Sequence, residues 1–196
     1  NGIRRMFFRQ QFDMARDASN LKTEEKRYST VMLGNPGLGK TTFARKKAEF
    51  LFAMGEAGNR YAELTRENLM GQFIGHTEAK ITALLSMVDM VFIDEAYNLV
   101  EPGSSSNDFG KKVIDALLTA VENNPNLVVF MAGYPKEMEG LISSNPGLRR
   151  RFGIYENFED MTRDQLGQVL DMMLGKGQMK IDDDARSHIL DKLDAC

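Results

Sequence analysis

The sequence predicts an α/β fold with a parallel five-stranded sheet flanked by helices, and three observations carry this prediction. Short apolar segments alternate with longer amphipathic ones, which is the pattern of parallel strands joined by crossover helices. Two of the segments, 90–93 and 127–132, are apolar throughout, as expected for strands covered on both faces. A glycine-rich loop at 34–41 stands between an apolar strand and a helix.

The remaining elements have signals of their own. Residues 3–18 place apolar side chains on one broad helical face. Thr162 and Gln165 have the spacing of a capping box, in which the threonine caps a helix and the glutamine reaches back to it. Residues 143–147 are expected to form a turn. In chain order, the expected helices are 3–18, 40–54, 78–87, 109–121, 136–142, 162–174 and 182–193, and the expected strands are 29–34, 61–64, 90–93, 127–132 and 153–158.

The chain is expected to contain two domains. The composition changes near residue 160, after which no strand signal appears. We therefore expect an α/β domain over 1–160 and the start of a small helical lid domain over 161–196. In the lid, Met172 and Met173 are expected to lie in a buried helix stripe with their leucine neighbours. Because helical sequence stands at both ends and no initiator methionine is present, we expect a piece of a larger protein, truncated in both domains.

Composition limits the classes of partner and compartment. The 42% hydrophobic and 27% charged residues are ordinary for a soluble globular protein. A net charge of −3 gives no strong attraction to nucleic acid, and no apolar run approaches the roughly 18 residues of a membrane span. The single cysteine, Cys196, excludes an intramolecular disulfide. We expect a soluble, intracellular protein, with nothing to indicate its compartment.

Residues Gly34–Thr41 match the phosphate-binding pattern Gly-x4-Gly-Lys-Ser/Thr. The glycines let successive backbone N–H groups turn toward phosphate oxygens, and the following helix presents its positive end. In this pattern Lys40 contacts the β- and γ-phosphates and the Thr41 hydroxyl binds Mg²⁺. We predict a site for ATP or ADP with Mg²⁺. The nucleotide-binding residues in the loop are expected to be Asn35, Pro36, Gly37, Leu38, Gly39, Lys40, Thr41 and Thr42.

A second motif is the apolar strand that ends in Asp94 and Glu95. Its carboxylates should stand beside the phosphate loop, because parallel strands end at one edge of the sheet. We expect Asp94 to bind nucleotide through Mg²⁺, mostly by way of water, and Glu95 to orient and polarise an attacking water. The alternative is a pair of solvated acids at a strand end. A water-activating acid favours hydrolysis over a kinase reaction.

Three consecutive arginines, Arg149, Arg150 and Arg151, form a third motif. For an isolated domain the favoured interpretation is a solvated basic surface. In a ring-forming ATPase, one such arginine instead reaches the γ-phosphate of a neighbouring subunit and stabilises the transition state.

Taken in order, these motifs resemble those of AAA+ ATPases with the P-loop NTPase sheet, and the finer match is to the CbbX/CfxQ subfamily. That subfamily includes red-type Rubisco activases and sporulation stage V protein K-like ATPases. The resemblance covers about residues 30–160. It implies ATP hydrolysis, a hexameric ring and a polypeptide client. The segments that carry it are 34–42, 71–77, 92–97, 132–134 and 144–151.

The resemblance implies a pore loop at Phe73, Ile74 and Gly75, where an aromatic residue grips a threaded polypeptide. Tyrosine is usual at the first of these positions, and phenylalanine keeps the ring without the hydroxyl. The alternative is that Phe73 and Ile74 are packed core residues.

The resemblance also implies roles for later residues. Arg151 matches the arginine finger, with Arg149 as its alternative, while Arg150 stands where a small residue is usual. Tyr134 matches the position of a polar nucleotide sensor, and a packed tyrosine is the alternative. The adenine-contacting segment and the lid arginine of the family are expected outside residues 1–196, so we expect weak activity from this fragment alone.

Three functions are consistent with these motifs. The leading one is an ATP-driven protein remodeller in which subunits of a ring couple hydrolysis to pulling on a client. The first rival is a catalytically weak nucleotide-binding scaffold domain of a tandem AAA+ protein, against which the intact Asp94 and Glu95 argue. The second is a nucleic-acid-dependent ATPase, which the acidic balance and the lack of a long basic stripe disfavour.

Overall fold

The computed structural model describes residues 28–65, 77–100 and 107–194. The expected helix at 3–18 and the expected pore loop at Phe73, Ile74 and Gly75 lie outside the described residues. The chain divides into two units between Phe158 and Glu159, each described by itself below. The predicted boundary at 160 and the identification of the second unit as a lid stay predictions.

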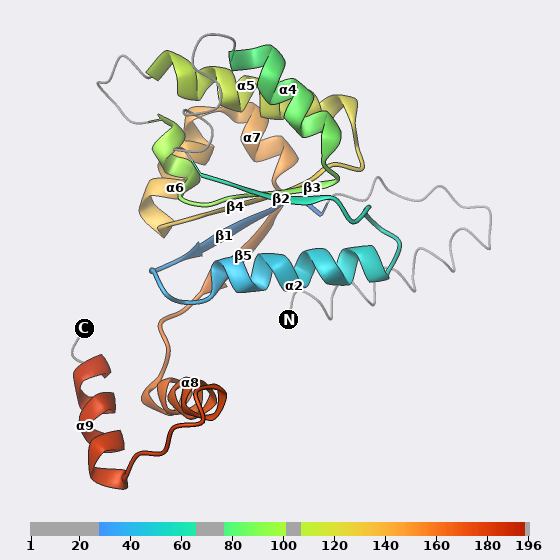
Figure 1. The fold of residues 1–196 in the computed structure, drawn as a ribbon. Helices are drawn as coiled ribbons and strands as arrows, with labels where there is room; N and C mark the ends of the chain where they lie inside the picture. The colour runs from blue at the N-terminus through green and yellow to red at the C-terminus, as the bar shows by residue number, and fades with distance from the viewer. Residues whose placement is uncertain (1–27, 66–76, 101–106, 195–196) are drawn as a thin grey trace, which may run out of the picture. The chain divides into compact units, whose positions relative to one another are not determined.

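The first unit is built on one five-stranded sheet in the order β2-β3-β4-β1-β5, in which every neighbouring pair is parallel (Figure 1). The α/β fold class is therefore confirmed. Connections between parallel strands must cross over, and here their helices lie on both faces of the sheet. The strands are β1 (Thr30–Gly34), β2 (Tyr61–Leu64), β3 (Met90–Ile93), β4 (Val128–Gly133) and β5 (Ile154–Phe158).

The helices of this unit divide between the two faces of the sheet (Figure 1). Helix α2 covers one face, and α4, α5, α6 and α7 lie on the other. A short 3₁₀ helix, η1, follows β3 and packs against α5 and α6. The bounds are α2 (Lys40–Ala53), α4 (Thr77–Met87), η1 (Ala96–Val100), α5 (Asn107–Asn123), α6 (Pro135–Ser144) and α7 (Pro146–Arg151).

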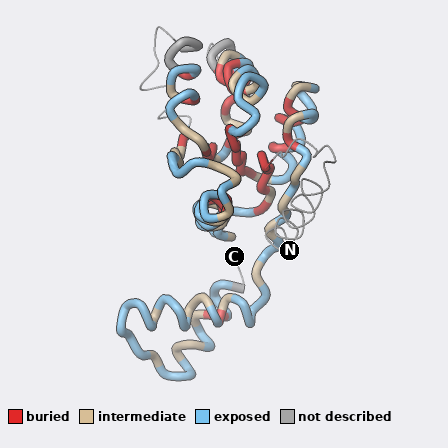
Figure 2. The backbone as a smooth tube through the Cα atoms, turned by 90° about the vertical axis from the view of Figure 1, so that its right-hand side faces the viewer, coloured by how far each residue is buried: buried red, intermediate tan, exposed pale blue. Residues whose placement is uncertain are grey.

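Two apolar cores lie on the two faces, and the alternation of side chains along the strands assigns residues to each. On β3, Met90 and Phe92 pack with α2, whereas Val91 and Ile93 pack with the helices of the opposite face. Strand β4 divides its side chains in the same way. Figure 2 shows that the buried positions concentrate in the sheet and the helix faces turned toward it. The continuous apolar runs are thus explained by burial on both faces.

Two short elements differ from the sequence prediction. Residues 143–147 were expected to form a turn, but α7 begins at Pro146 and carries the three arginines in its last turn. The Asn145 side chain caps it by accepting a hydrogen bond from Gly147 N at 2.8 Å, and proline is well placed at a first helical position. Helix η1 was also missed, because five residues are too few to show a helical period.

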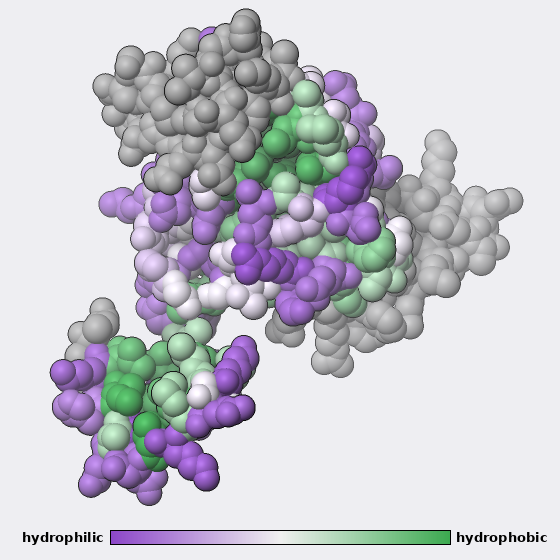
Figure 3. Space-filling model, viewed as in Figure 1, coloured by the Kyte–Doolittle hydropathy of each residue, from purple (hydrophilic) through white to green (hydrophobic). Residues whose placement is uncertain are grey.

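The second unit holds α8 (Arg163–Lys176) and α9 (Asp183–Asp194). The predicted capping box is confirmed, since Thr162 Oγ1 accepts from Gln165 N and Thr162 N donates to Gln165 Oε1. The predicted burial of Met172 and Met173 is wrong, because they are 54% and 62% exposed. Two helices offer too little surface to cover every apolar side chain. Figure 3 shows apolar surface on this unit.

One buried charge joins α2 to the sheet. Lys47 is 1% exposed, and its Nζ donates to Thr30 Oγ1 at 2.8 Å and lies 3.9 Å from Glu156 Oε1 on β5. The ammonium also lies 5.8 Å and 5.9 Å from the ring centroids of Phe43 and Phe130. Burial lowers the pKa of Lys47 to about 8, and the carboxylate of Glu156 opposes this change.

This pKa predicts a pH-dependent stability. Below about pH 8 the lysine is protonated in both the folded and the unfolded chain, whereas above it the folded chain loses the proton first. Unfolding then requires proton uptake, so stability rises with pH up to the unfolded pKa of 10.5. Relative to a Lys47→Met variant, we expect the free energy of unfolding to rise by about 2 kcal/mol between about pH 7 and pH 9.5. Urea denaturation of both proteins measures this difference, and a difference that stays constant with pH would refute the assignment.

Candidate functional site

The phosphate loop connects the end of β1 to the start of α2. Gly37 and Gly39 have φ angles of 76° and 82°, in the left-handed region that favours glycine. Gly39 is also the residue that precedes the helix, where it leaves the first N–H groups of α2 without a side-chain cap. The loop therefore turns tightly and presents backbone donors at the positive end of a 14-residue helix.

Lys40 lies back along this loop. Its Nζ donates to Gly34 O and to Asn35 O, each at 2.7 Å. Partial burial lowers the pKa of Lys40, while the carboxylates of Asp94 and Glu95 oppose that shift. The ammonium thus lies close enough to both acids for their charge to act on it. The two carbonyl oxygens that it contacts could be replaced by the oxygens of a bound anion.

A cavity of about 160 Å³ opens at the carboxyl ends of β1, β3 and β4. The sheet brings these ends together because β4 lies between β1 and β3. This is the edge at which open parallel sheets bind ligands. Of the predicted nucleotide and catalytic residues, the cavity is lined by Pro36, Gly37, Lys40, Thr41, Asp94, Glu95 and Tyr134. Asn35, Leu38, Gly39 and Thr42 belong to the same loop and helix start but do not line it.

The two acids are held in a tight turn after β3. Glu95 has a φ of 46°, which is uncommon for a residue with a side chain and is often found at functional sites. Its backbone N donates to Asp94 Oδ1 at 3.1 Å, and Asn98 Nδ2 donates to Glu95 Oε2 at 3.0 Å. Both carboxylates are therefore oriented by hydrogen bonds within the turn.

Two residues at the cavity were not singled out from the sequence as site residues, Tyr97 and Gly133. The Tyr97 ring lies 5.6 Å from the Tyr134 ring, centroid to centroid. A side chain at Gly133 would collide with Tyr97 Cδ1 at 2.7 Å, so glycine is needed for this packing. Burial, followed by the charge of Glu95, raises the pKa of Tyr97 to about 12. The two tyrosine rings together form part of the cavity lining.

Thr41 and Asp94 offer the donors that Mg²⁺ requires. Their hydroxyl and carboxylate oxygens line one cavity, and Mg²⁺ binds oxygen ligands while keeping several waters and phosphate oxygens. Among the residues that the structure describes, no group of three or more His, Cys, Asp or Glu could hold a metal by itself. The donor set therefore fits a metal completed by nucleotide phosphates and water.

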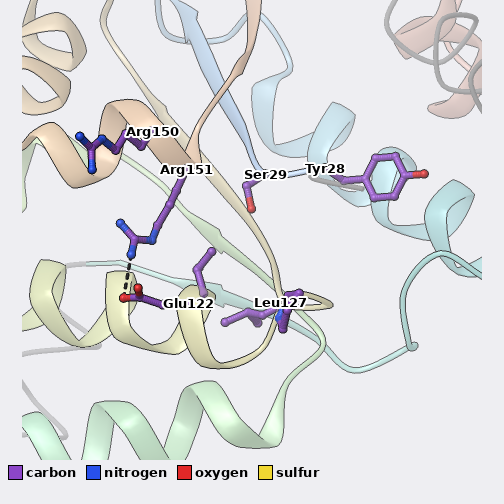
Figure 4. Close-up of a pocket in the computed structure, with 8 residues that line it drawn as sticks. Tyr28, Ser29, Glu122, Leu127, Arg150 and Arg151 are labelled. Atoms are coloured by element: carbon purple, nitrogen blue, oxygen red, sulfur yellow. Dashed lines mark ion pairs between the residues drawn. The ribbon is translucent and has the colours of Figure 1, made fainter. Parts of the chain in front are cut away.

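Of the three arginines, Arg151 lies at the opposite edge of the sheet. Arg151 precedes β5, and its Nη2 lies 2.8 Å from Glu122 Oε2 near the end of α5 (Figure 4). The Arg151 side chain is 20% exposed and lines a cavity with residues that precede β1 and β4. Arg149 and Arg150 are exposed on α7, and Arg149 lines a different cavity with residues of β1, β5 and α6. Since β1 has five residues of about 3.3 Å each, roughly 16 Å of sheet separates Arg151 from the chain's own phosphate loop.

A phosphate loop with its lysine and threonine, facing an Asp-Glu pair across a shared cavity, defines a nucleotide-binding protein of the P-loop class. Residues 30–160 match the family described as ATPase family associated with various cellular activities (AAA). The chain belongs to this family and is an ATPase module.

Curated relatives place the chain in the CbbX/CfxQ subfamily. Protein CbxX, chromosomal, of Cupriavidus necator is 40% identical over 82% of this chain and 51% of the relative. The chloroplastic ribulose bisphosphate carboxylase/oxygenase activase of Cyanidioschyzon merolae is 36% identical over 91% and 62%. Stage V sporulation protein K of Bacillus subtilis is 35% identical over 91% and 56%. The chain spans about half the length of the first of these relatives.

Solved structures share the fold. The AAA domain of FIGL-1 in complex with ADP has a TM-score of 0.59 and 21% identity, over 83% of this chain and 53% of that one. A RuvB variant from Thermotoga maritima has a TM-score of 0.60 and 20% identity, over 92% and 55%. At these identities the similarity supports the five-stranded α/β fold alone. In the described part of the chain, no helix has the length and apolar character to cross a membrane.

Proposed function

We propose that this chain hydrolyses ATP with Mg²⁺ as one module of a ring-forming ATPase that remodels a polypeptide client. The observation that supports the chemistry is the single cavity lined by Lys40, Thr41, Asp94 and Glu95. These four residues supply a cation for the phosphates, two oxygen donors for the metal and a carboxylate for water. Mg²⁺ would neutralise charge on the β- and γ-phosphates.

In this proposal each side chain has one task. Lys40, which donates to two backbone carbonyls, would donate to phosphate oxygens instead, and Asp94 and Thr41 would hold the metal. Glu95 accepts a proton from the attacking water, which makes it the general base. Tyr134 lines the same cavity and is a candidate sensor of the nucleotide, although its packing against Tyr97 supports a structural role equally well.

We propose that Arg151 acts on the nucleotide of a neighbouring subunit. It lies at the edge of the sheet opposite its own loop, so a role in catalysis requires a second chain. An arginine supplied in this way stabilises the charge of the transition state. Arg149, exposed on the same short helix, is the alternative. Within its own chain the Arg151 guanidinium pairs with Glu122.

Mixing two inactive variants of the whole protein tests this arrangement. We expect Arg151→Ala and Glu95→Gln each to lose hydrolysis by at least about 100-fold, since an arginine finger and a general base each contribute that much or more. When the two variants are mixed, some interfaces pair an intact Glu95 with an intact Arg151. Phosphate release should then recover to a substantial fraction of the wild-type rate.

The matched control is Arg150→Ala, which removes the neighbouring charge from the same helix and should leave hydrolysis near the wild-type rate. If mixed variants stay inactive although mixed rings form, Arg151 does not act across an interface. If Arg149→Ala rather than Arg151→Ala is the variant rescued by mixing, the alternative arginine is the finger.

The remodelling part of the proposal rests on family membership. One relative is named as a ribulose bisphosphate carboxylase/oxygenase activase, which makes Rubisco one candidate client, and nothing in this chain selects it. Holding the whole Glu95→Gln protein with ATP should trap a ring with its client. A stable monomer without a client under those conditions would favour the rival scaffold role, and stimulation of hydrolysis by DNA or RNA would favour a nucleic-acid-dependent ATPase.

A further inference from the structure

The Glu95 carboxylate is held by a neighbour that stands outside the cavity. Asn98 Nδ2 donates to Glu95 Oε2 at 3.0 Å, and Asn98 N donates to Glu95 O at 2.9 Å. The same two residues are thus joined through both backbone and side chain. Glu95 lines the nucleotide cavity, whereas Asn98 does not. The amide therefore holds the carboxylate without itself lining the cavity in which nucleotide would lie.

The neutral amide of Asn98 is a suitable hydrogen-bond donor for a carboxylate that acts as a general base. A lysine or arginine in the same place would form an ion pair and neutralise the carboxylate. A neutral amide fixes the direction of the group and leaves its negative charge intact. Asn98 engages Oε2, and the side chain of Tyr97 also hydrogen-bonds to the Glu95 carboxylate. Glutamate has several rotatable bonds, so an anchor at one oxygen restricts where the other can lie.

The backbone around this contact is also specialised. Glu95 has left-handed dihedral angles, with a φ of 46°, and Asn98 belongs to the short helix η1 that begins immediately after it. Helix η1 is fixed in turn by the buried side chains of Ala96 and Leu99. Asn98 therefore belongs to a packed helix, which limits the movement of its amide.

We propose that Asn98 is a positioning residue for hydrolysis, which orients the Glu95 carboxylate toward the attacking water. This inference rests on the proposed role of Glu95 as the general base. Asn98 acts through Glu95 and has no contact of its own with nucleotide. Its removal should lower the rate of hydrolysis and leave nucleotide affinity unchanged.

The test compares Asn98→Asp and Asn98→Ala in the whole protein. Aspartate keeps the size of asparagine but replaces the donor with an acceptor, and alanine removes the group. Misplacing a reacting group by about 1 Å costs on the order of 100-fold in rate, so we expect kcat to fall by about 10- to 100-fold in both variants. The dissociation constant for ATP should stay within about two-fold of wild type. Asn98→Gln, which keeps an amide on a longer stem, should recover part of the rate.

The control is Asn126→Asp, which makes the same chemical change at an exposed asparagine that precedes β4, at the edge of the sheet away from the cavity. It should leave both kcat and affinity unchanged. A second comparison adds Asn98→Ala to Glu95→Gln. Because Asn98 acts through the carboxylate, the double variant should be no slower than Glu95→Gln alone.

The roles of Asn98 and Glu95 can fail independently in these experiments. If Glu95→Gln abolishes hydrolysis while Asn98→Asp and Asn98→Ala keep the wild-type kcat, the role of Asn98 is refuted and that of Glu95 stands. If the Asn98 variants lose affinity in proportion to rate, or melt well below the wild type, the residue is structural and the inference is wrong. If Glu95→Gln hydrolyses ATP at the wild-type rate, both fail together.

Discussion

Replacing Lys40 with alanine is expected to remove nucleotide binding. The ammonium lies at the mouth of the loop and makes two hydrogen bonds of 2.7 Å to backbone carbonyls, which phosphate oxygens would replace. Hydrogen bonds to charged groups contribute roughly 1.5–3 kcal/mol each, so the loss of two such bonds should weaken affinity by at least about 100-fold. Equilibrium binding of a fluorescent ATP analogue measures this change directly.

Lys46 provides the matched control for this experiment. It lies on the same helix but is largely exposed, and its partner is Glu49 one turn away. Alanine at position 46 should change the affinity by less than about two-fold, because exposed ion pairs of this kind contribute little. Equal losses in the two variants would mean that the helix, rather than the Lys40 ammonium, had been damaged. Unchanged affinity in Lys40→Ala would remove the loop from the binding site.

Replacing Glu95 with glutamine is expected to separate binding from hydrolysis. The substitution keeps the shape of the side chain and its contact with Asn98, because an amide oxygen also accepts a hydrogen bond. What it removes is the ability to take a proton from water. General-base catalysis contributes roughly 100- to 10,000-fold, so phosphate release should fall by that range while ATP affinity stays close to wild type.

The control for this variant is Glu49→Gln, at an exposed position of α2 that lies outside the cavity. It makes the same change of charge and should leave the rate unaltered. Pre-steady-state measurement of phosphate release with saturating ATP distinguishes slow chemistry from slow product release. A Glu95→Gln protein that turns over at the wild-type rate would mean that a different group activates the water.

Much of the fold could be predicted from the sequence, because its strongest signals are local. Strands β3 and β4 are apolar throughout, and a segment of that kind needs cover on both faces. The phosphate loop depends on Gly37 and Gly39, whose left-handed backbone favours glycine, so the loop can be recognised from its glycines in the sequence. The capping box at Thr162 is a contact between residues three apart, so spacing alone reveals it.

The features that escaped prediction depend on partners that are distant in the chain or on short elements. In the sequence Lys47 cannot be distinguished from the other lysines of its helix. Only the fold shows that it contacts Thr30 and Glu156. The ion pair of Arg151 with Glu122 joins α7 to α5, which are separated in the chain by β4 and α6. The role inferred for Asn98 arises from the turn after β3, which brings its amide back onto Glu95. A spacing of three residues from an acid was the only available signal for it.

The contacts of Lys47 also have a mechanical consequence for the strand that leaves the first unit. Helix α2 begins at the phosphate loop, and Lys47 ties its middle to β5 through Glu156. The Phe43 ring packs edge-on against Phe158, the last residue of β5, with centroids 5.3 Å apart. These two attachments, about one helical turn apart on α2, resist sliding and twisting of the helix relative to the strand. Helix α2 and β5 are therefore attached to each other at two points, the second of which is the last residue of the strand.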